Sequence, residues 1–337
     1  MTTRVAVNGL GRIGRAYLRS VVESDDVEVV AVNDIADSAT LARLLRYDST
    51  FGPLGLDVTD HGDAISVADR KFALTHEREV SSLPWAEYGV EVVIESTGHH
   101  LTRDAAAGHL DAGAAKVIIS APGHGVDATI VMGVNDGHYD PGHHHVLSAA
   151  SCTTNCAAPM AKVLHETFGI VEGFLTTDHA YTNDQNLLDG PHRDPRRARG
   201  AAVNIIPTTT GAARAVAEVL PELAGRLDGV ALRVPVPDGS LVDFTVLLDR
   251  AVQPAEVNAA FEWAATSGPL AGRLRYTTDP IVSTDVIGNP ALCVFDSGLT
   301  QVSGHSGRLV TVFGWYDNEW GYTARLVELT RLVAAAR

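Results

Sequence analysis

Short apolar runs alternate with helix-like segments over the first 150 residues of the chain. Residues 4–8 and 27–33 have the length and composition of strands, and the segment that starts at Arg12 between them has helical periodicity. Further runs of this kind, each followed by small or turn-forming residues, lie at 90–95, 116–120 and 145–148. Such alternation predicts right-handed βαβ units and a parallel sheet. Sheets of this type bind ligands at the carboxyl ends of their strands, so we expect a site there.

The character of the sequence changes near residue 150. Helical segments are now mixed with longer β-rich runs, at 229–235, 241–248 and 309–315. Residues 318–335 have the spacing of an amphipathic helix, which we expect to pack against the first domain. The predicted fold class is therefore α/β: a doubly wound, parallel-sheet (Rossmann) domain over residues 1–150, completed by residues 318–337, and an α+β second domain with a mixed or antiparallel sheet over residues 151–317.

Composition and charge exclude several classes of partner. With 337 residues and 45% hydrophobic side chains the chain can bury large cores, and a formal charge of -15 disfavours a nucleic acid partner. Every apolar run falls short of the ~20 residues that span a bilayer, and the N-terminus resembles no export signal, so we expect no membrane partner. Three cysteines do not form a disulfide framework. We expect a protein of the reducing cytoplasm.

The segment VAVNGLGRIGR, residues 5–15, places three glycines in the G-x-G-x-x-G spacing between a strand and a helix. Gly9 permits a tight turn, Gly11 lets the backbone approach a pyrophosphate, and Gly14 allows close packing on the strand. The helix N-terminus offers N–H groups to anionic oxygens. Asp34, about twenty residues after the last glycine, is placed to bind ribose hydroxyls and to repel a 2′-phosphate. The segment predicts a dinucleotide site that takes NAD rather than NADP.

A cysteine stands where a helix of the second domain is expected to begin. In SAASCTTNC, residues 148–156, Ser151 is the expected N-cap and Cys152 falls in the first turn. The positive end of the helix dipole and unpaired N–H groups lower the pKa of such a thiol and raise its reactivity. Cys156 lies one turn further along. We interpret it as packing, because no second Cys or His pair accompanies it to complete a zinc site.

A histidine lies in a polar cluster, TTDHAYTNDQ at residues 176–185, after an apolar strand-like run. We expect His179 to form an ion pair with Cys152, to act as general base, and then to interact with the developing oxyanion. The remaining histidines are expected to be structural or solvated. Three of them are adjacent, at 143–145, but the neighbouring Pro141 and Gly142 are typical of an exposed loop. The sequence predicts no metal ion.

The glycine loop and the segments around Cys152 and His179 resemble those of the phosphorylating glyceraldehyde-3-phosphate dehydrogenases, and the resemblance extends over essentially the full length of the chain. The resemblance also rests on a series of shorter motifs: ESTG at 95–98, ISAP at 119–122, VMGVN at 131–135, RRAR at 196–199, IIPTTTGAARAV at 205–216, LRVPVP at 232–237 and WYDNEWGY at 315–322. It implies NAD as cofactor and a homotetramer in which the loop around residues 181–204 packs near a neighbouring subunit's cofactor.

The resemblance also implies roles for single residues. Cys152 is the nucleophile and His179 its base. The cofactor is contacted by Arg12 and Ile13 at the pyrophosphate, Asp34 at the ribose, Arg78 and Thr97 on the adenine side, and Ser120 and Asn318 on the nicotinamide side. Two anion sites hold the substrate phosphate and the attacking phosphate, the first formed by Thr182 and Arg233, the second by Ser151, Thr153, Thr210 and Gly211, with Arg197 close by. Hydroxyls, N–H groups and guanidinium groups suit tetrahedral oxyanions.

The implied reaction oxidises D-glyceraldehyde 3-phosphate with NAD and inorganic phosphate to 1,3-bisphosphoglycerate, through a thiohemiacetal and a thioester on Cys152. The alternatives are an erythrose-4-phosphate dehydrogenase-like paralogue, a cysteine hydrolase and a non-catalytic NAD-binding protein. The hydrolase leaves the glycine loop and Asp34 without a role. Ala149, Ala157 and Gly190 depart from the family's usual residues. Small side chains near the nucleophile suggest the further hypothesis of a specialised isoform resistant to epoxide inhibitors.

Overall fold

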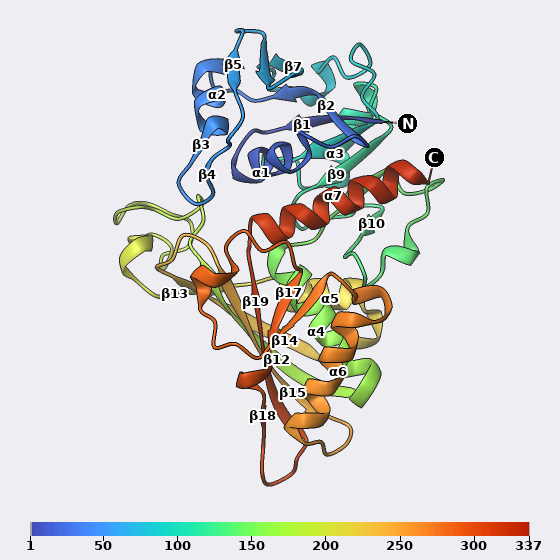
Figure 1. Ribbon diagram of the computed structural model, residues 1–337, viewed down its shortest axis with the longest axis vertical. Helices are drawn as coiled ribbons and strands as arrows, with labels where there is room; N and C mark the ends of the chain where they lie inside the picture. The colour runs from blue at the N-terminus through green and yellow to red at the C-terminus, as the bar shows by residue number, and fades with distance from the viewer. Residues whose placement is uncertain (1, 337) are drawn as a thin grey trace. The chain divides into compact units, whose positions relative to one another are not determined.

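The computed structural model describes residues 2–336, which form two compact units (Figure 1). The first unit contains the chain up to Met132, the segment Asp136–Ala150 and the segment from Thr323 onward. The second unit contains Gly133–Asn135 and Ser151–Tyr322. All the helical turns and strands named below belong to one of these units, except that the C-terminal helix α7 (Trp320–Ala335) begins in the second and continues into the first.

Within residues 2–336, the first unit is built on a nine-stranded sheet with the order β10-β11-β9-β8-β1-β2-β7-β6-β5. The strands are β1 (Thr3–Asn8), β2 (Val27–Asn33), β5 (Val58–Asp60), β6 (Ala64–Val67), β7 (Arg70–Thr75), β8 (Val92–Glu95), β9 (Lys116–Ile119), β10 (Ala128–Thr129) and β11 (Val146–Ser148). All pairs from β10 to β7 are parallel, as predicted. Strands β5, β6 and β7 pair antiparallel. This edge was missing from the sequence prediction.

The central strands of this sheet are apolar on both faces because helices cover them. Val5, Ala6 and Val7 of β1 have no exposed surface, which is the pattern of a parallel strand between two helical layers. The helices of this unit are α1 (Arg12–Val21), α2 (Ser38–Arg46), α3 (Arg103–Asp111) and most of α7. A short pair, β3 (Tyr47–Asp48) with β4 (Gly52–Pro53), follows α2. Tyr17 in α1 donates a hydrogen bond to Thr330 in α7, at 3.0 Å, so α7 packs on α1.

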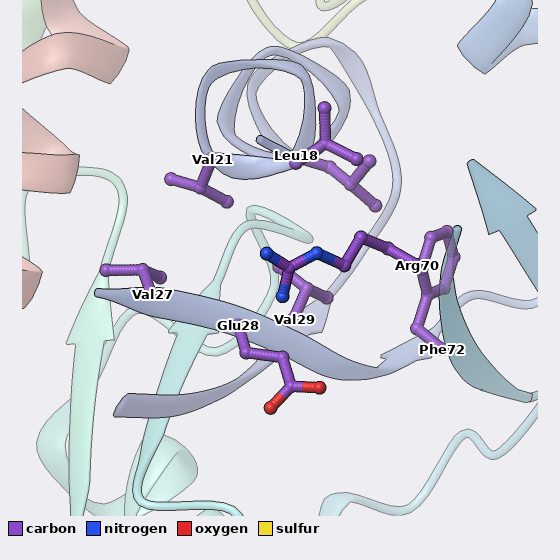
Figure 2. Close-up of a pocket in the computed structure, with 8 residues that line it drawn as sticks. Leu18, Val21, Val27, Glu28, Val29, Arg70 and Phe72 are labelled. Atoms are coloured by element: carbon purple, nitrogen blue, oxygen red, sulfur yellow. The ribbon is translucent and has the colours of Figure 1, made fainter. Parts of the chain in front are cut away.

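A small gap remains between α1 and the sheet (Figure 2). It is lined by Leu18 and Val21 from the helix and by residues of β2 and β7, and the long side chain of Arg70 extends across it (Figure 2). Its volume is about 10 Å³, close to the space that one water molecule needs. The gap is therefore a packing feature and has no room for a substrate or a cofactor.

The second unit has a mixed sheet with the order β13-β14-β12-β15-β19-β17-β16, and β18 pairs with β19. The strands are β12 (Ile170–Ala180), β13 (Ile206–Thr209), β14 (Leu227–Val234), β15 (Ser240–Leu248), β16 (Leu274–Thr277), β17 (Cys293–Asp296), β18 (Gln301–Val302) and β19 (Leu309–Tyr316). The helices α4 (Cys152–Phe168), α5 (Ala212–Val219) and α6 (Pro254–Thr266) cover one face (Figure 1). The predicted α+β domain with a mixed sheet is confirmed.

The other face of this sheet carries a row of exposed apolar side chains. Phe174 of β12 is 67% exposed, and Val230 of β14 and Leu309 of β19 are also exposed. The register places Phe174 opposite Thr245, and Leu309 opposite Leu247, on the same side of the sheet. Nothing in residues 2–336 covers these side chains as α4, α5 and α6 cover the opposite face. In the same described part of the chain, no helix is long and apolar enough to cross a membrane.

Candidate active site

Cys152 is the first residue of α4, and the local sequence explains why the helix starts there. Ser151 is the N-cap, and its Oγ accepts a hydrogen bond from the backbone N–H of Thr154 at 3.0 Å. One residue earlier, Ala150 has a φ of 59°, in the left-handed region that residues with a side chain seldom adopt. The chain thus turns sharply and presents Cys152 in the first helical turn, where backbone N–H groups lack partners within the helix.

The sheet brings a histidine to this cysteine. His179 lies near the end of β12, and its Nε2 is 3.2 Å from Sγ of Cys152. Its Nδ1 lies 2.7 Å from the carbonyl oxygen of Ala180, which can only accept a hydrogen bond. Nδ1 also lies 2.6 Å from Nη1 of Arg233, so this nitrogen has both an acceptor and a donor beside it. When the imidazole proton is on Nδ1, the lone pair of Nε2 faces the thiol, as a general base requires. The ring of Tyr316 packs edge-on against the imidazole, with the ring centroids 6.0 Å apart.

The surroundings of Cys152 and His179 shift the pKa values of both side chains so that their neutral forms are favoured. Burial raises the pKa of the Cys152 thiol to about 11, against the opposing effects of the Arg233 charge and the Thr153 N–H group. Burial, reinforced by the Arg233 charge, lowers the pKa of His179 to about 3. These directions are opposite to the lowered thiol pKa and the ion pair expected from the sequence. Desolvation of the thiolate outweighs the helix terminus here, although part of the Cys152 residue is exposed.

Cationic and hydroxyl groups surround the histidine. Arg233 of β14 is opposite His179 in the register, and its Nη1 lies 3.0 Å from the Ala180 carbonyl and 2.6 Å from Nδ1. Its Nε has no hydrogen-bond partner among the described residues. Thr182 and Arg197 both bond to the carboxylate of Asp184. Burial raises the pKa of Asp184, but the bond from Thr182 and the nearby guanidinium charges lower it overall. The cluster can thus hold an anion.

The residues expected at the second anion site lie at two helix starts. Ser151 and Thr153 belong to the start of α4, and Thr210 and Gly211 precede α5, which packs against α4. The hydroxyl of Thr153 bonds to that of Tyr316 at 2.8 Å, and Oγ1 of Thr210 accepts from Ala212 N–H at 3.1 Å. No hydrogen bond within residues 2–336 links Thr210 or Gly211 directly to Ser151. The pairing of these two segments around phosphate stays a prediction.

The glycine loop of the first unit has the shape that a dinucleotide needs. Gly9 has a φ of +94°, and a Cβ there would lie 2.8 Å from the Thr97 nitrogen. A Cβ on Gly14 would lie 2.0 Å from the Gly9 carbonyl oxygen, so any side chain would force loop and helix apart. Around Gly11, by contrast, the space is open. The loop therefore fits a pyrophosphate at Gly11 and requires glycine at the other two positions.

Asp34 and Arg12 flank this loop and are held in place. The carboxylate of Asp34 accepts hydrogen bonds from Leu10 N–H at 2.7 Å and from Ala36 N–H at 2.9 Å. Lone pairs of both oxygens remain for ribose hydroxyls. The guanidinium of Arg12 forms a two-pronged ion pair with Asp48, at 3.0 and 3.2 Å. Ile13 follows it in the first turn of α1 and is partly buried.

The other expected cofactor residues fall in both units. Arg78 is exposed beyond β7, Thr97 follows β8, and Ser120 follows β9, all in the first unit. Asn318 belongs to the second unit, where its Oδ1 accepts a hydrogen bond from Ser240 at 2.6 Å. Strand ends in the first unit thus present most of the expected NAD contacts at one edge of its sheet, the carboxyl edge.

Sequence reasoning assigned no role to several residues that organise these sites. Asp48 orients Arg12, Ser240 holds Asn318, and Tyr316 joins Thr153 to Thr177 of β12 through its hydroxyl group, at 2.8 and 2.9 Å. Their partners lie far away along the chain, so local pattern gives no signal for them. The third cysteine, Cys293, is buried, as is Cys156. Among the described residues no three His, Cys, Asp or Glu side chains are grouped to hold a metal ion.

Comparison with known proteins assigns the chain to a family. Residues 3–103 match the glyceraldehyde 3-phosphate dehydrogenase NAD binding domain, and residues 151–318 match the C-terminal domain of the same enzyme. The chain belongs to the glyceraldehyde-3-phosphate dehydrogenase family. It is 58% identical to the glyceraldehyde-3-phosphate dehydrogenase of Streptomyces coelicolor over 99% of both chains. It is 53% identical to that of Geobacillus stearothermophilus, again over 99% of both.

Membership of the glyceraldehyde-3-phosphate dehydrogenase family establishes the general activity. The chain is an NAD-dependent oxidoreductase with a nucleotide-binding Rossmann domain, and NAD is its cofactor. The family recognition, the α/β fold and the enzyme class predicted from sequence are confirmed. The glycine loop fits this cofactor in shape, and Asp34 fits it in charge.

Proposed function

We propose that the chain is a phosphorylating glyceraldehyde-3-phosphate dehydrogenase in which Cys152 and His179 carry out the chemistry. The observation that carries the proposal is the 3.2 Å approach of Nε2 of His179 to Sγ of Cys152 at a helix N-terminus, beside Arg233. A hydrolase would need the same pair but no NAD site. A non-catalytic NAD-binding protein would need neither residue.

The proposed reaction begins with proton transfer from the Cys152 thiol to Nε2 of His179, as sulfur adds to the aldehyde carbon of D-glyceraldehyde 3-phosphate. His179 is neutral at physiological pH, because its pKa is lowered to about 3, and its Nε2 lies 3.2 Å from the thiol sulfur, within reach of this proton. His179 returns this proton to the aldehyde oxygen, which gives the neutral thiohemiacetal, and it takes the hydroxyl proton back while the same carbon loses hydride. NAD, when bound, accepts that hydride. The product on the enzyme is a thioester, in which the sulfur of Cys152 holds the acyl group.

Inorganic phosphate then cleaves the thioester and releases 1,3-bisphosphoglycerate and the Cys152 thiolate. Two anions must be held, the 3-phosphate of the substrate and the attacking phosphate. We assign the first to Thr182 and Arg233, whose free Nε supports an anion ligand, and the second to Ser151, Thr153, Thr210 and Gly211 with Arg197 nearby. The carboxylate of Asp184 accepts hydrogen bonds from Thr182 and Arg197, so a bound phosphate would compete with it for these donors.

We assign the cofactor contacts to the glycine loop at Gly9, Gly11 and Gly14, with Arg12, Ile13, Asp34, Arg78, Thr97, Ser120 and Asn318. We further propose a homotetramer, supported by the uncovered apolar face of the second sheet and by exposed apolar residues at 187–205. A reducing cytoplasmic location follows from the need to keep Cys152 as a free thiol.

The proposal is tested by NADH production from purified protein. We expect absorbance at the NADH band to rise only when D-glyceraldehyde 3-phosphate and phosphate are both present. Erythrose 4-phosphate, offered at equal concentration, tests the alternative of an erythrose-4-phosphate dehydrogenase-like paralogue. Faster turnover of this longer sugar phosphate would identify it, and not the triose phosphate, as the substrate. Cys152→Ser should abolish turnover and leave the affinity for NAD within about twofold, since serine is a far weaker nucleophile. Turnover by that variant would remove Cys152 as the nucleophile.

The hypothesis of an inhibitor-resistant isoform stays a proposal. Ala157 in α4 is fully buried and Ala149 is nearly so. Both residues therefore belong to the packed core on either side of Cys152 in the chain. Ala149→Asn with Ala157→Leu should restore fast inactivation by an epoxide that alkylates Cys152. Equal inactivation rates in the variant and the parent would refute resistance through these two positions.

A further inference from the structure

A fully buried carboxylate lies at the carboxyl edge of the first unit's sheet, outside the residues assigned to catalysis or to NAD. Glu95 is the last residue of β8 and is 1% exposed. Its Oε2 lies 3.0 Å from Nε2 of His109 and 2.6 Å from Nδ2 of Asn8, and its Oε1 takes the backbone N–H of Thr97 at 2.8 Å and the Thr97 hydroxyl. Both His109 and Asn8 are buried as well.

The tautomer of His109 is fixed by a tryptophan. Nε1 of Trp85 lies 2.9 Å from Nδ1 of His109, and an indole N–H can only donate. Nδ1 must therefore carry the lone pair, so the proton is on Nε2 and points at Glu95. His109 is a neutral donor in this position, and Trp85 and His109 have no exposed surface through which water could replace the bond.

A second chain of donors reaches the same carboxylate oxygen, Oε2, through Asn8. Oδ1 of Asn33 accepts the Glu77 N–H at 2.9 Å and the Thr75 hydroxyl at 2.9 Å. Nδ2 of Asn33 donates to Oδ1 of Asn8 at 2.8 Å. Nδ2 of Asn8 then donates to Glu95. Each amide orientation is set by the one before it, and every bond of both chains points toward Glu95.

All these donors favour the ionised form of Glu95. Burial alone would raise its pKa, but the hydrogen bonds from His109, Thr97 and Asn8 more than offset this and lower it below the ordinary value. The carboxylate is thus the single acceptor on which the network ends. A neutral amide of the same shape would place its own N–H donors against these buried donors, which is the costly case for a polar network.

The network touches four strand ends, each next to a residue assigned to NAD. Asn8 precedes Gly9 at the end of β1, Asn33 precedes Asp34 at the end of β2, and Glu77 precedes Arg78 beyond β7. Thr97 is bonded directly to the carboxylate. We propose that Glu95 is a positioning residue for NAD: its buried carboxylate aligns these four loops in the cofactor-binding arrangement. The proposal rests on the NAD-binding role of the unit and on the residue assignments above.

The test is the affinity of the full-length, NAD-free enzyme for NAD, measured by isothermal titration calorimetry. Glu95→Gln keeps the shape but places an NH₂ group against the His109 and Asn8 donors, and His109 cannot switch tautomer while Trp85 donates to it. We expect the Kd to rise about tenfold or more, as the loss of ~1.4 kcal/mol implies. At saturating NAD, kcat should change by less than about threefold, because Cys152 and His179 belong to the other unit.

The matched control is Ile94→Val, one residue earlier on β8 and also fully buried. It loses core packing without touching the network, so we expect some loss of thermal stability but an unchanged Kd for NAD. This control separates a general weakening of the core from a specific effect on the loops. An equal loss of NAD affinity in Ile94→Val and Glu95→Gln would overturn the positioning role.

A double variant tests the direction of the hydrogen bonds in the network. Trp85→Phe removes the indole N–H and frees His109 to move its proton to Nδ1, so Nε2 could accept from a glutamine at 95. We therefore expect Trp85→Phe with Glu95→Gln to bind NAD at least about threefold more tightly than the product of the two single effects predicts. Losses that simply multiply would refute the donor arrangement.

The experiment stays decisive if a variant does not fold, and it separates the positioning role from the NAD site itself. If Glu95→Gln does not fold, Asn33→Ala cuts the other donor chain and should weaken NAD binding by a similar factor; wild-type affinity in whichever of the two variants folds overturns the proposal. Absence of NAD binding by the unaltered enzyme would refute the cofactor site, and the positioning role with it. Normal binding by the unaltered enzyme and by Glu95→Gln alike would refute the positioning role alone.

Discussion

At the scale of single residues, burial decides the protonation of the groups near the active site. Asp238 and Asp317 are each 1% exposed, and they interact beside the turn that carries Asn318. Burial, then the nearby charges of Asp317 and Glu319, raise the pKa of Asp238 to about 8. Asp317 accepts three backbone N–H bonds, from Gly288, Glu319 and Trp320, whereas Oδ2 of Asp238 has no hydrogen-bond partner among the described residues. Asp238 is therefore the partner that holds the proton.

This proton makes stability depend on pH in a definite direction. Between about pH 4 and pH 8 the folded protein keeps a proton on Asp238 that the unfolded chain has released, so stability falls as the pH rises through this window. Asp238→Asn is neutral in both states and avoids this loss. We expect it to raise stability at pH 8 by on the order of 2–5 kcal/mol and to give almost no gain near pH 4.

Calorimetric Tm values at pH 5 and pH 8 would measure this difference. The control is Asp228→Asn, because Asp228 also bonds to the N–H of the following glycine but is exposed on β14. Its Tm should be nearly that of the parent at both pH values. A gain for Asp238→Asn that is the same at pH 5 and pH 8 would contradict the protonated carboxyl.

At the scale of elements, the sequence predicted the parts whose signals are local. The strand at 27–33 has the predicted bounds, and Ser151 caps α4 so that Cys152 opens it, as the S-C-T-T pattern indicated. The antiparallel strands β5 and β6 went unpredicted, because they are only three and four residues long and carry little periodicity. The approach of His179 to Cys152 joins residues 27 positions apart. Neither hydrophobic pattern nor capping residues encode this distance, so the sequence analysis could infer the pairing only from the chemistry of the two residues and from the family resemblance.

The cap of α4 can be tested against the cap of a helix remote from the chemistry. Ser151→Ala removes the bond to Thr154 N–H, and Thr102→Ala removes the equivalent bond to Ala105 N–H at the start of α3. Each should lower stability by ~1 kcal/mol in denaturant titrations. Only Ser151→Ala should also raise the KM for phosphate, because Ser151 is assigned to the attacking anion. Equal phosphate KM values in the two variants would remove Ser151 from that site.

At the scale of the whole molecule, two apolar surfaces have no cover within residues 2–336. The sheet surface consists of Phe174, Val230 and Leu309, and the loop surface consists of Leu187, Leu188, Val203 and Ile205, of which Val203 is 80% exposed. Exposed side chains of this size, grouped on two separate parts of a unit, are typical of protein interfaces. A tetramer with dihedral symmetry has at least two kinds of interface, which matches two surfaces.

Each surface should therefore stabilise a different contact. We expect the parent protein to sediment near four times the 35.7 kDa chain mass. A charge buried at an apolar interface is strongly unfavourable, so Phe174→Glu and Val203→Glu should each give dimers, and their combination should give monomers. Trp263→Glu, at a lone exposed aromatic on α6, is the control and should leave the mass unchanged. Analytical ultracentrifugation at micromolar concentration distinguishes these states. A monomeric parent, or single variants that keep the full assembly, would show that these surfaces do not join the subunits.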